Sequence, residues 1–179
     1  MKKMSLVLSI FLLSMNVFAD QHHDKGLGAH EHGSLKLDMA VEGKTIELDI
    51  DGPAESFVGF EYVPKTEKEK TTFNQAQALW TKDLLTKLFV LDKKLGCTFS
   101  EASFKQEIEE HDQKDKKEAG VHSDIEASAK IICAQDLKGQ TVEVALKKHY
   151  SHIKKLSIDL VGTTTQSIEV KNSVEKIKL

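Results

Sequence analysis

Apolar and polar residues alternate along two neighbouring stretches near the start of the chain, and this alternation predicts a β-hairpin. Side chains two positions apart in a strand point to the same face, so each stretch has one face suited to burial. The residues between the stretches, Glu-Gly-Lys at 42–44, are typical of a turn. The apolar positions are Leu35, Leu37, Met39 and Val41 in the first stretch and Ile46, Leu48 and Ile50 in the second.

Apolar residues then recur at three- and four-residue steps over residues 66–91, a pattern that indicates helix. This region lacks Gly and Pro, and it predicts one helix near 66–80 and a second near 81–91. Thr66 followed by Glu69 predicts a capping box at the start of the first helix. Residues 52–66 contain both prolines of the chain, which indicates a loop that crosses the domain.

Alternation returns after Gly96 and continues nearly to the C-terminus. It predicts strands over 97–109, 122–134 and 140–150, and a final hairpin formed by 156–162 and 166–172. A charged loop at 111–120 separates the first two of these strands. The grouping of strands and helices predicts an α+β fold, with an antiparallel β-sheet and a helical segment packed on one face, in a single domain over 34–179.

The first 19 residues form a pattern of their own. A basic Met-Lys-Lys start, an apolar run and a small residue at position 19 predict a signal peptide cleaved after Ala19. The apolar run is shorter than the roughly 20 residues that a membrane-spanning helix needs, and no second run follows. We therefore expect export without membrane insertion, and residues 20–33 then form a histidine-rich N-terminal segment.

The charge of the chain argues against two classes of partner. The formal net charge is −3, and cleavage would remove Lys2 and Lys3 without any acidic residue, which gives −5. Nucleic acids and anionic membranes bind basic faces, so neither is expected as a partner. The chain also lacks a nucleophile elbow, a glycine-rich phosphate loop, an HExxH motif and a CxxC motif, so we predict no enzyme.

Two cysteines remain in the exported chain, Cys97 and Cys133. An even number of cysteines in an exported protein is typical of a disulfide, and we predict that these two are bonded. A pair of free thiols is the alternative if the compartment is reducing.

Histidine is concentrated near the exported N-terminus, where His30 and His32 precede the first predicted strand. Residues at i and i+2 point to the same side, and two imidazoles held side by side supply half of a tetrahedral zinc site. His122 and Asp124 repeat this spacing at the start of another predicted strand and would add one nitrogen and one oxygen ligand. We predict a zinc site formed by His30, His32, His122 and Asp124, with His22, His23, His111 and Asp112 as secondary candidates.

Other interpretations of these residues remain open. The pair of His30 and His32 is also typical of histidines that are simply exposed to solvent. Residues 122–124 are also typical of a segment that only caps a loop. A chain that begins Asp20-Gln21-His22 would bind copper or nickel through its amine, two backbone amides and one imidazole. An exported interaction domain with incidental histidines is a further alternative. His149 and His152 lie in a lysine-rich turn that repels cations, and we interpret them as surface residues.

Several segments together resemble the ZrgA-like zinc-regulated periplasmic zinc-binding proteins of Gram-negative bacteria. The resemblance implies a periplasmic α+β domain that binds zinc and supplies a zinc importer, such as an ABC transporter or its solute-binding protein, when zinc is scarce. It implies a ligand role for His30, His32 and His122, with Asp124 beside them. The segments are GAHEHG at 28–33, VGFEYVPKTEKEK at 58–70, GC at 96–97 and HSDIEASAKIIC at 122–133, and they extend over nearly the whole exported chain.

The chain departs from that family's pattern in two places. Many relatives have a long His- and Asp-rich run between the cysteine-bearing strands, whereas residues 109–124 contain only His111 and His122 as histidines. We therefore expect one site and not a loop that collects several ions. Relatives also tend to have histidine where this chain has Tyr62, so a ligand role at that position is lost while Glu61 remains.

Overall fold

The computed structural model describes residues 33–108 and 122–179, and the predicted first hairpin is present. β1 (Ser34–Glu42) and β2 (Thr45–Pro53) pair antiparallel, with Glu42 opposite Thr45 across a two-residue turn. Gly43 in this turn has a φ of +56°, a left-handed conformation that glycine adopts without a steric cost. The predicted signal peptide, the histidine-rich segment through residue 32 and the charged loop at 111–120 lie outside the described residues.

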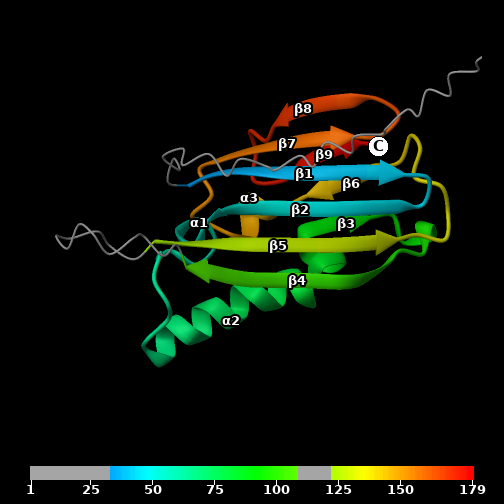
Figure 1. Cartoon of the computed structure of the whole chain (residues 1–179). Coiled ribbons are helices and arrows are strands. Elements are labelled where there is room, and N and C mark those ends of the chain that lie inside the picture. The colour runs from blue at the N-terminus through cyan, green and yellow to red at the C-terminus, as the bar shows by residue number, and fades with distance from the viewer. Residues whose placement is uncertain (1–32, 109–121) are drawn as a thin grey trace, which may run out of the picture.

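Six strands form the larger sheet, in the order β4-β5-β2-β1-β7-β8 (Figure 1). The expected α+β fold is confirmed, and all neighbouring strands are antiparallel except β1 and β7, which run parallel. This parallel pair was not predicted, because alternation shows which residues form a strand but not which distant strand will lie beside it. The strands not yet delimited are β4 (Thr98–Ile108), β5 (Ser123–Ile132), β7 (Lys155–Val161) and β8 (Thr165–Glu169).

Helical structure is partly as predicted. α2 (Glu67–Thr81) matches the first predicted helix and begins at the predicted capping box. The second predicted helix, near 81–91, is present only as a short π-helix, η1 (Leu84–Leu88), and the end of its range is instead a strand, β3 (Phe89–Leu91). A short apolar run fits both the helical and the strand periodicity, and its packing in the folded protein decides which structure forms.

Several other short elements differ from the sequence-based prediction. The predicted loop at 52–66 contains a helix, α1 (Ala54–Val58), and the predicted strand at 140–150 is β6 (Thr141–Val144) followed by α3 (Leu146–His149). A short 3-10 helix, η2 (Lys93–Leu95), and a C-terminal strand, β9 (Glu175–Lys178), were not predicted. Within the described part of the chain, no helix is long and apolar enough to cross a membrane.

A second layer packs against one face of the larger sheet. It consists of α2, η1 and a smaller sheet in the order β3-β6-β9. Trp80 of α2 is fully buried, and its Nε1 donates to the Ser128 carbonyl of β5 at 3.0 Å. Its ring meets Phe89 edge-on, with the centroids 5.9 Å apart. The inward apolar residues of β1, β2 and β5 share this core, as the alternation predicted.

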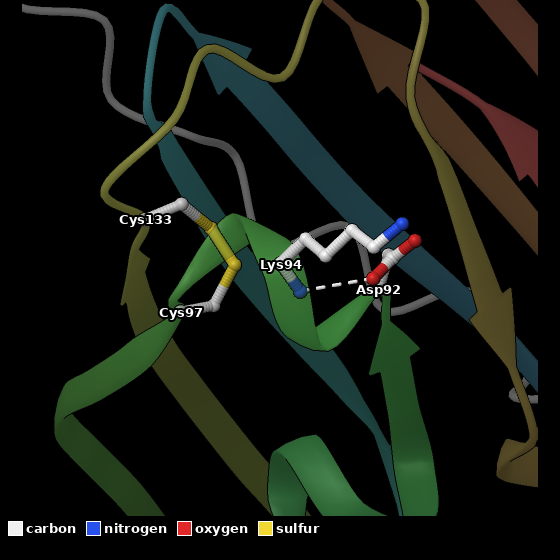
Figure 2. The surroundings of a disulfide bond; sticks show 4 residues. All are labelled: Asp92, Lys94, Cys97 and Cys133. Carbon is white, nitrogen blue, oxygen red and sulfur yellow. Dashed lines mark hydrogen bonds between the residues drawn. A yellow bond between two sulfur atoms is a disulfide. The ribbon is translucent and has the colours of Figure 1, made fainter.

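The two ends of the larger sheet differ in what they carry. At the first, which we call the disulfide end, Cys97 precedes β4, Cys133 follows β5, and the two form the predicted disulfide (Figure 2). Asp92 caps η2 beside it, accepting a hydrogen bond from the backbone N–H of Lys94 at 2.9 Å (Figure 2). At the opposite end, the His122 end, β1, β5 and β7 begin and β2 and β4 finish, next to α1 (Figure 1).

Candidate metal centre

The His122 end brings together segments that are distant in the sequence. β1 begins directly after Gly33, whose carbonyl accepts hydrogen bonds from the backbone N–H groups of Lys154 (2.8 Å) and Lys155 (3.0 Å). β5 begins at Ser123, and only β2 lies between β5 and β1. Because adjacent strands are about 4.8 Å apart, the starts of β1 and β5 are separated by about 10 Å.

His122 contacts a carboxylate at this end of the sheet. Its Nδ1 is hydrogen-bonded to Oε2 of Glu61, which lies in the loop between α1 and α2. The His122 side chain is 51% exposed and the Glu61 side chain is 16% exposed. An imidazole nitrogen and a carboxylate oxygen are both zinc ligands. The pair is therefore open enough for an ion to reach it and chemically suited to hold one.

The backbone of the Glu61 loop is fixed by two side chains of the larger sheet. Ser123 is buried, and its hydroxyl donates to the carbonyl of Glu61 at 2.7 Å. Gln106 of β4 donates from Nε2 to the Ser123 hydroxyl at 2.7 Å and to the carbonyl of Tyr62 at 3.2 Å. Two consecutive carbonyls of the loop are thus bonded to the sheet next to His122.

A second set of hydrogen bonds holds the far side of the same loop. The Glu69 carboxylate accepts from the backbone N–H groups of Thr66 (2.8 Å) and Lys65 (2.9 Å) and from the Tyr62 hydroxyl (2.9 Å). These donors favour the ionised form and lower the pKa of Glu69 to about 2. Tyr62 therefore contributes to the anchoring of α2, and its hydroxyl is bonded to Glu69.

His152 also lies at the His122 end, against the first residue of the loop. Gly59 has a φ of +84°, and a methyl group added to it would lie 2.7 Å from Nε2 of His152. The imidazole thus packs directly on the Gly59 backbone. His152 is exposed, which agrees with its interpretation as a surface residue.

The predicted ligand set lies only partly within the described residues. Asp124 is on β5, opposite Pro53 and Glu107, and is partly buried. Over residues 33–108 and 122–179, no group of three or more His, Cys, Asp or Glu side chains is placed to hold a metal ion. The described part supplies the pair of Glu61 and His122. The candidates outside it are His22, His23, His30, His32, His111 and Asp112.

Glu61 was not among the predicted ligands, although its segment carried a signal. The sequence GFEY at 59–62 belongs to the segment 58–70 that carries the family resemblance, and Glu61 is its first acidic residue. Alternation could not pair it with His122. Since β5 begins at Ser123, His122 lies outside the strand, and side-chain parity does not orient it.

A family model with the description "ZrgA family zinc uptake protein" matches residues 29–179. The chain belongs to the ZrgA family. This confirms the family expected from the sequence, and zinc uptake implies a transport role and not a catalytic one. No curated protein matches the chain. For a member of the ZrgA family, the nitrogen and oxygen donors of His122 and Glu61 suit the ion that the family takes up.

Proposed function

We propose that this protein is a periplasmic zinc-binding protein, which scavenges zinc or delivers it to an uptake system when zinc is limiting. The family match supports the choice of zinc as cargo. The disulfide suits an oxidising compartment such as the periplasm, which agrees with the predicted signal peptide. The receiving partner in this proposal is a zinc ABC transporter or its solute-binding protein.

The observation that carries the proposal is the contact between His122 and Glu61, at the end of the larger sheet where β1 also begins. Zinc binds neutral imidazole and carboxylate in tetrahedral sites, with ligand bonds of about 2 Å. The nitrogen of His122 and the oxygen of Glu61 therefore fit this ion and not a cation that prefers only oxygen ligands.

The proposed site joins these two residues to the predicted ligands from the N-terminal segment. Gly33, which follows His32 in the sequence, lies at the His122 end, where its carbonyl accepts hydrogen bonds from the backbone N–H groups of Lys154 and Lys155. We propose that His30, His32 and His122 supply nitrogen ligands. Asp124 and Glu61 are the candidate oxygen ligands, and Glu61 is favoured by its contact with His122.

The direct test is isothermal titration of zinc into the disulfide-bonded protein and into the His30→Ala/His32→Ala variant. We expect the variant to lose at least tenfold in affinity, because two of the proposed ligands are removed. Affinity of the unchanged protein should also fall steeply below about pH 6, because imidazole must be neutral to bind the ion. Equal affinities for the two proteins would remove this ligand set.

A further inference from the structure

We propose that Gln106 and Ser123 are positioning residues that hold the Glu61 carboxylate against His122 and thereby set the zinc affinity of the site. The inference rests on the proposed function, in which Glu61 and His122 bind the ion. Neither Gln106 nor Ser123 needs to touch zinc. Their role is to fix the loop that carries Glu61 relative to β5, the strand that begins directly after His122.

The hydrogen bonds form a continuous connection from β4 to the loop. Gln106 donates to the Ser123 hydroxyl at 2.7 Å, and that hydroxyl donates to the Glu61 carbonyl at 2.7 Å. Nε2 of Gln106 also donates to the Tyr62 carbonyl, with the nitrogen and the oxygen 3.2 Å apart. Ser123 is only 1% exposed and directly follows His122, so one buried hydroxyl ties the two candidate ligands together.

A bulge in β4 places Gln106, and not a lysine, at this position. The pairing of β4 with β5 shifts by one residue between Ser100 and Ser103, and beyond the shift Gln106 lies opposite Ile125 on the buried face. Without the extra residue, the alternation begun by Phe99 opposite Ile131 would place Lys105 there. A neutral amide can donate to both the Ser123 hydroxyl and the Tyr62 carbonyl, whereas an ammonium group next to the site would repel a cation.

Preorganisation explains why this connection matters for binding. When an ion binds a mobile carboxylate, part of the binding free energy is lost to the entropy of ordering that side chain. A carboxylate that is already held in place loses less entropy on binding. Residues that orient metal ligands typically account for about 10- to 100-fold in metal affinity. We therefore expect Gln106→Leu to weaken zinc binding by about tenfold.

A matched control is available on the neighbouring helix. Gln77 of α2 also donates from Nε2 to a backbone carbonyl, that of Phe104 on the same strand, at 3.1 Å. Gln77→Leu removes a bond of the same kind without touching the Glu61 loop. It should leave zinc affinity within about twofold of the unchanged protein. A tenfold loss in this control too would overturn the positioning role, because it would reflect general loosening of β4.

The decisive measurement is a double-mutant cycle for zinc affinity between Gln106→Leu and Glu61→Gln, by titration at pH 7. If Gln106 acts through Glu61, its substitution has little further effect once the carboxylate is gone, so the two losses are not additive. Additive losses would overturn the proposal. So would a normal affinity of Gln106→Leu alongside a weakened Glu61→Gln, which leaves the proposed zinc site intact.

Failure of the zinc site itself gives a different pattern. If Glu61→Gln and His122→Ala both bind zinc normally, the site of the proposed function is wrong and the positioning role fails with it. Ser123→Ala and Ser123→Thr provide an independent check, because threonine keeps the hydroxyl. The alanine variant should lose affinity and the threonine variant should recover it, and equal affinities for the two would contradict the role of the hydroxyl.

Discussion

The two ends of the larger sheet are held together by different interactions. The disulfide end has a covalent bond between β4 and β5 and backbone bonds from neighbouring loops, including Cys133 N–H to the Lys44 carbonyl and Leu137 N–H to the Gly43 carbonyl, both 2.8 Å. At the His122 end, the loop with Glu61 is fastened by the side chains of Gln106 and Ser123. The first end supplies stability, and the second carries the groups suited to bind an ion.

The energies involved explain this division. A disulfide between residues 36 apart contributes about 4 kcal/mol in the chain-entropy model. A single side-chain hydrogen bond contributes about 1 kcal/mol net. Regions that open locally and respond to ligands are drawn from the less stable part of a protein. The disulfide can therefore keep the sheet together while weaker hydrogen bonds position the candidate ligands at the His122 end.

The largest expected effect comes from removing the covalent bond. Cys97→Ser combined with Cys133→Ser should lower the free energy of unfolding by about 2–5 kcal/mol, measured by urea denaturation. Under conditions in which the variant is folded, its zinc affinity should stay within about twofold of that of the unchanged protein. The reason is that the disulfide lies at the opposite end of the sheet from the proposed site. A large loss of affinity in the folded variant would show that the two ends are coupled.

His122→Ala should have the reverse profile. The exposed imidazole contributes little to packing, so the free energy of unfolding should change by less than about 0.5 kcal/mol without zinc. Zinc affinity should fall at least tenfold in a titration at pH 7, because a proposed ligand is lost. His149→Ala is the control, since that histidine is on α3 and is not one of the proposed ligands, so zinc affinity should be unchanged.

Gly43 and Gly59 both have left-handed backbones, so the same substitution at each compares the two ends of the sheet. Both Gly43→Ala and Gly59→Ala place a side chain at positive φ, which costs about 1–2 kcal/mol. Nothing lies within 4 Å of a methyl group at Gly43, whereas the methyl group at Gly59 would collide with His152. Thermal unfolding should show the larger loss for Gly59→Ala, and only that variant should weaken zinc binding. Equal losses of zinc affinity in the two variants would contradict the conclusion that only the His122 end binds the ion.

The smallest effect expected is on the pH dependence of stability. The pKa of Glu69 falls from its ordinary 4.5 to about 2, so its stabilising contribution is complete above pH 4.5 and is lost as the pH falls toward 2. Glu69→Gln should therefore be less stable than the unchanged protein at pH 7, and the difference should shrink between pH 4.5 and 2. Urea titrations at several pH values measure this. A difference that is constant with pH would exclude the ionised carboxylate as its cause.

Much of the fold could be predicted because it depends on local pattern. Alternation at Leu35, Leu37 and Met39 fixed the inward face of β1, and the Thr66–Glu69 spacing fixed the start of α2. The neighbour of β1 across the sheet could not be predicted in this way. Its pairing with β7 depends on how the whole domain packs, which a single stretch of sequence does not encode locally.

The candidate site was less predictable than the fold for a related reason. His122 was identified from its residue type and spacing, but its contact with Glu61 depends on the path of a loop. That path is set by Gln106, and the face on which Gln106 lies depends on a bulge that a simple period-two pattern misses. Identifying the pair from sequence alone would require predicting one irregular residue in a strand.

The parallel pairing of β1 with β7 also bears on how the chain matures. Among the described strands β1 is made first, yet the neighbour on one of its sides is supplied only when β7 has been made. Until then that side of β1 presents unpaired N–H and C=O groups, which can recruit a strand from another molecule. A chain truncated before Lys155 should therefore aggregate, and productive assembly should depend on late, long-range contacts that form slowly.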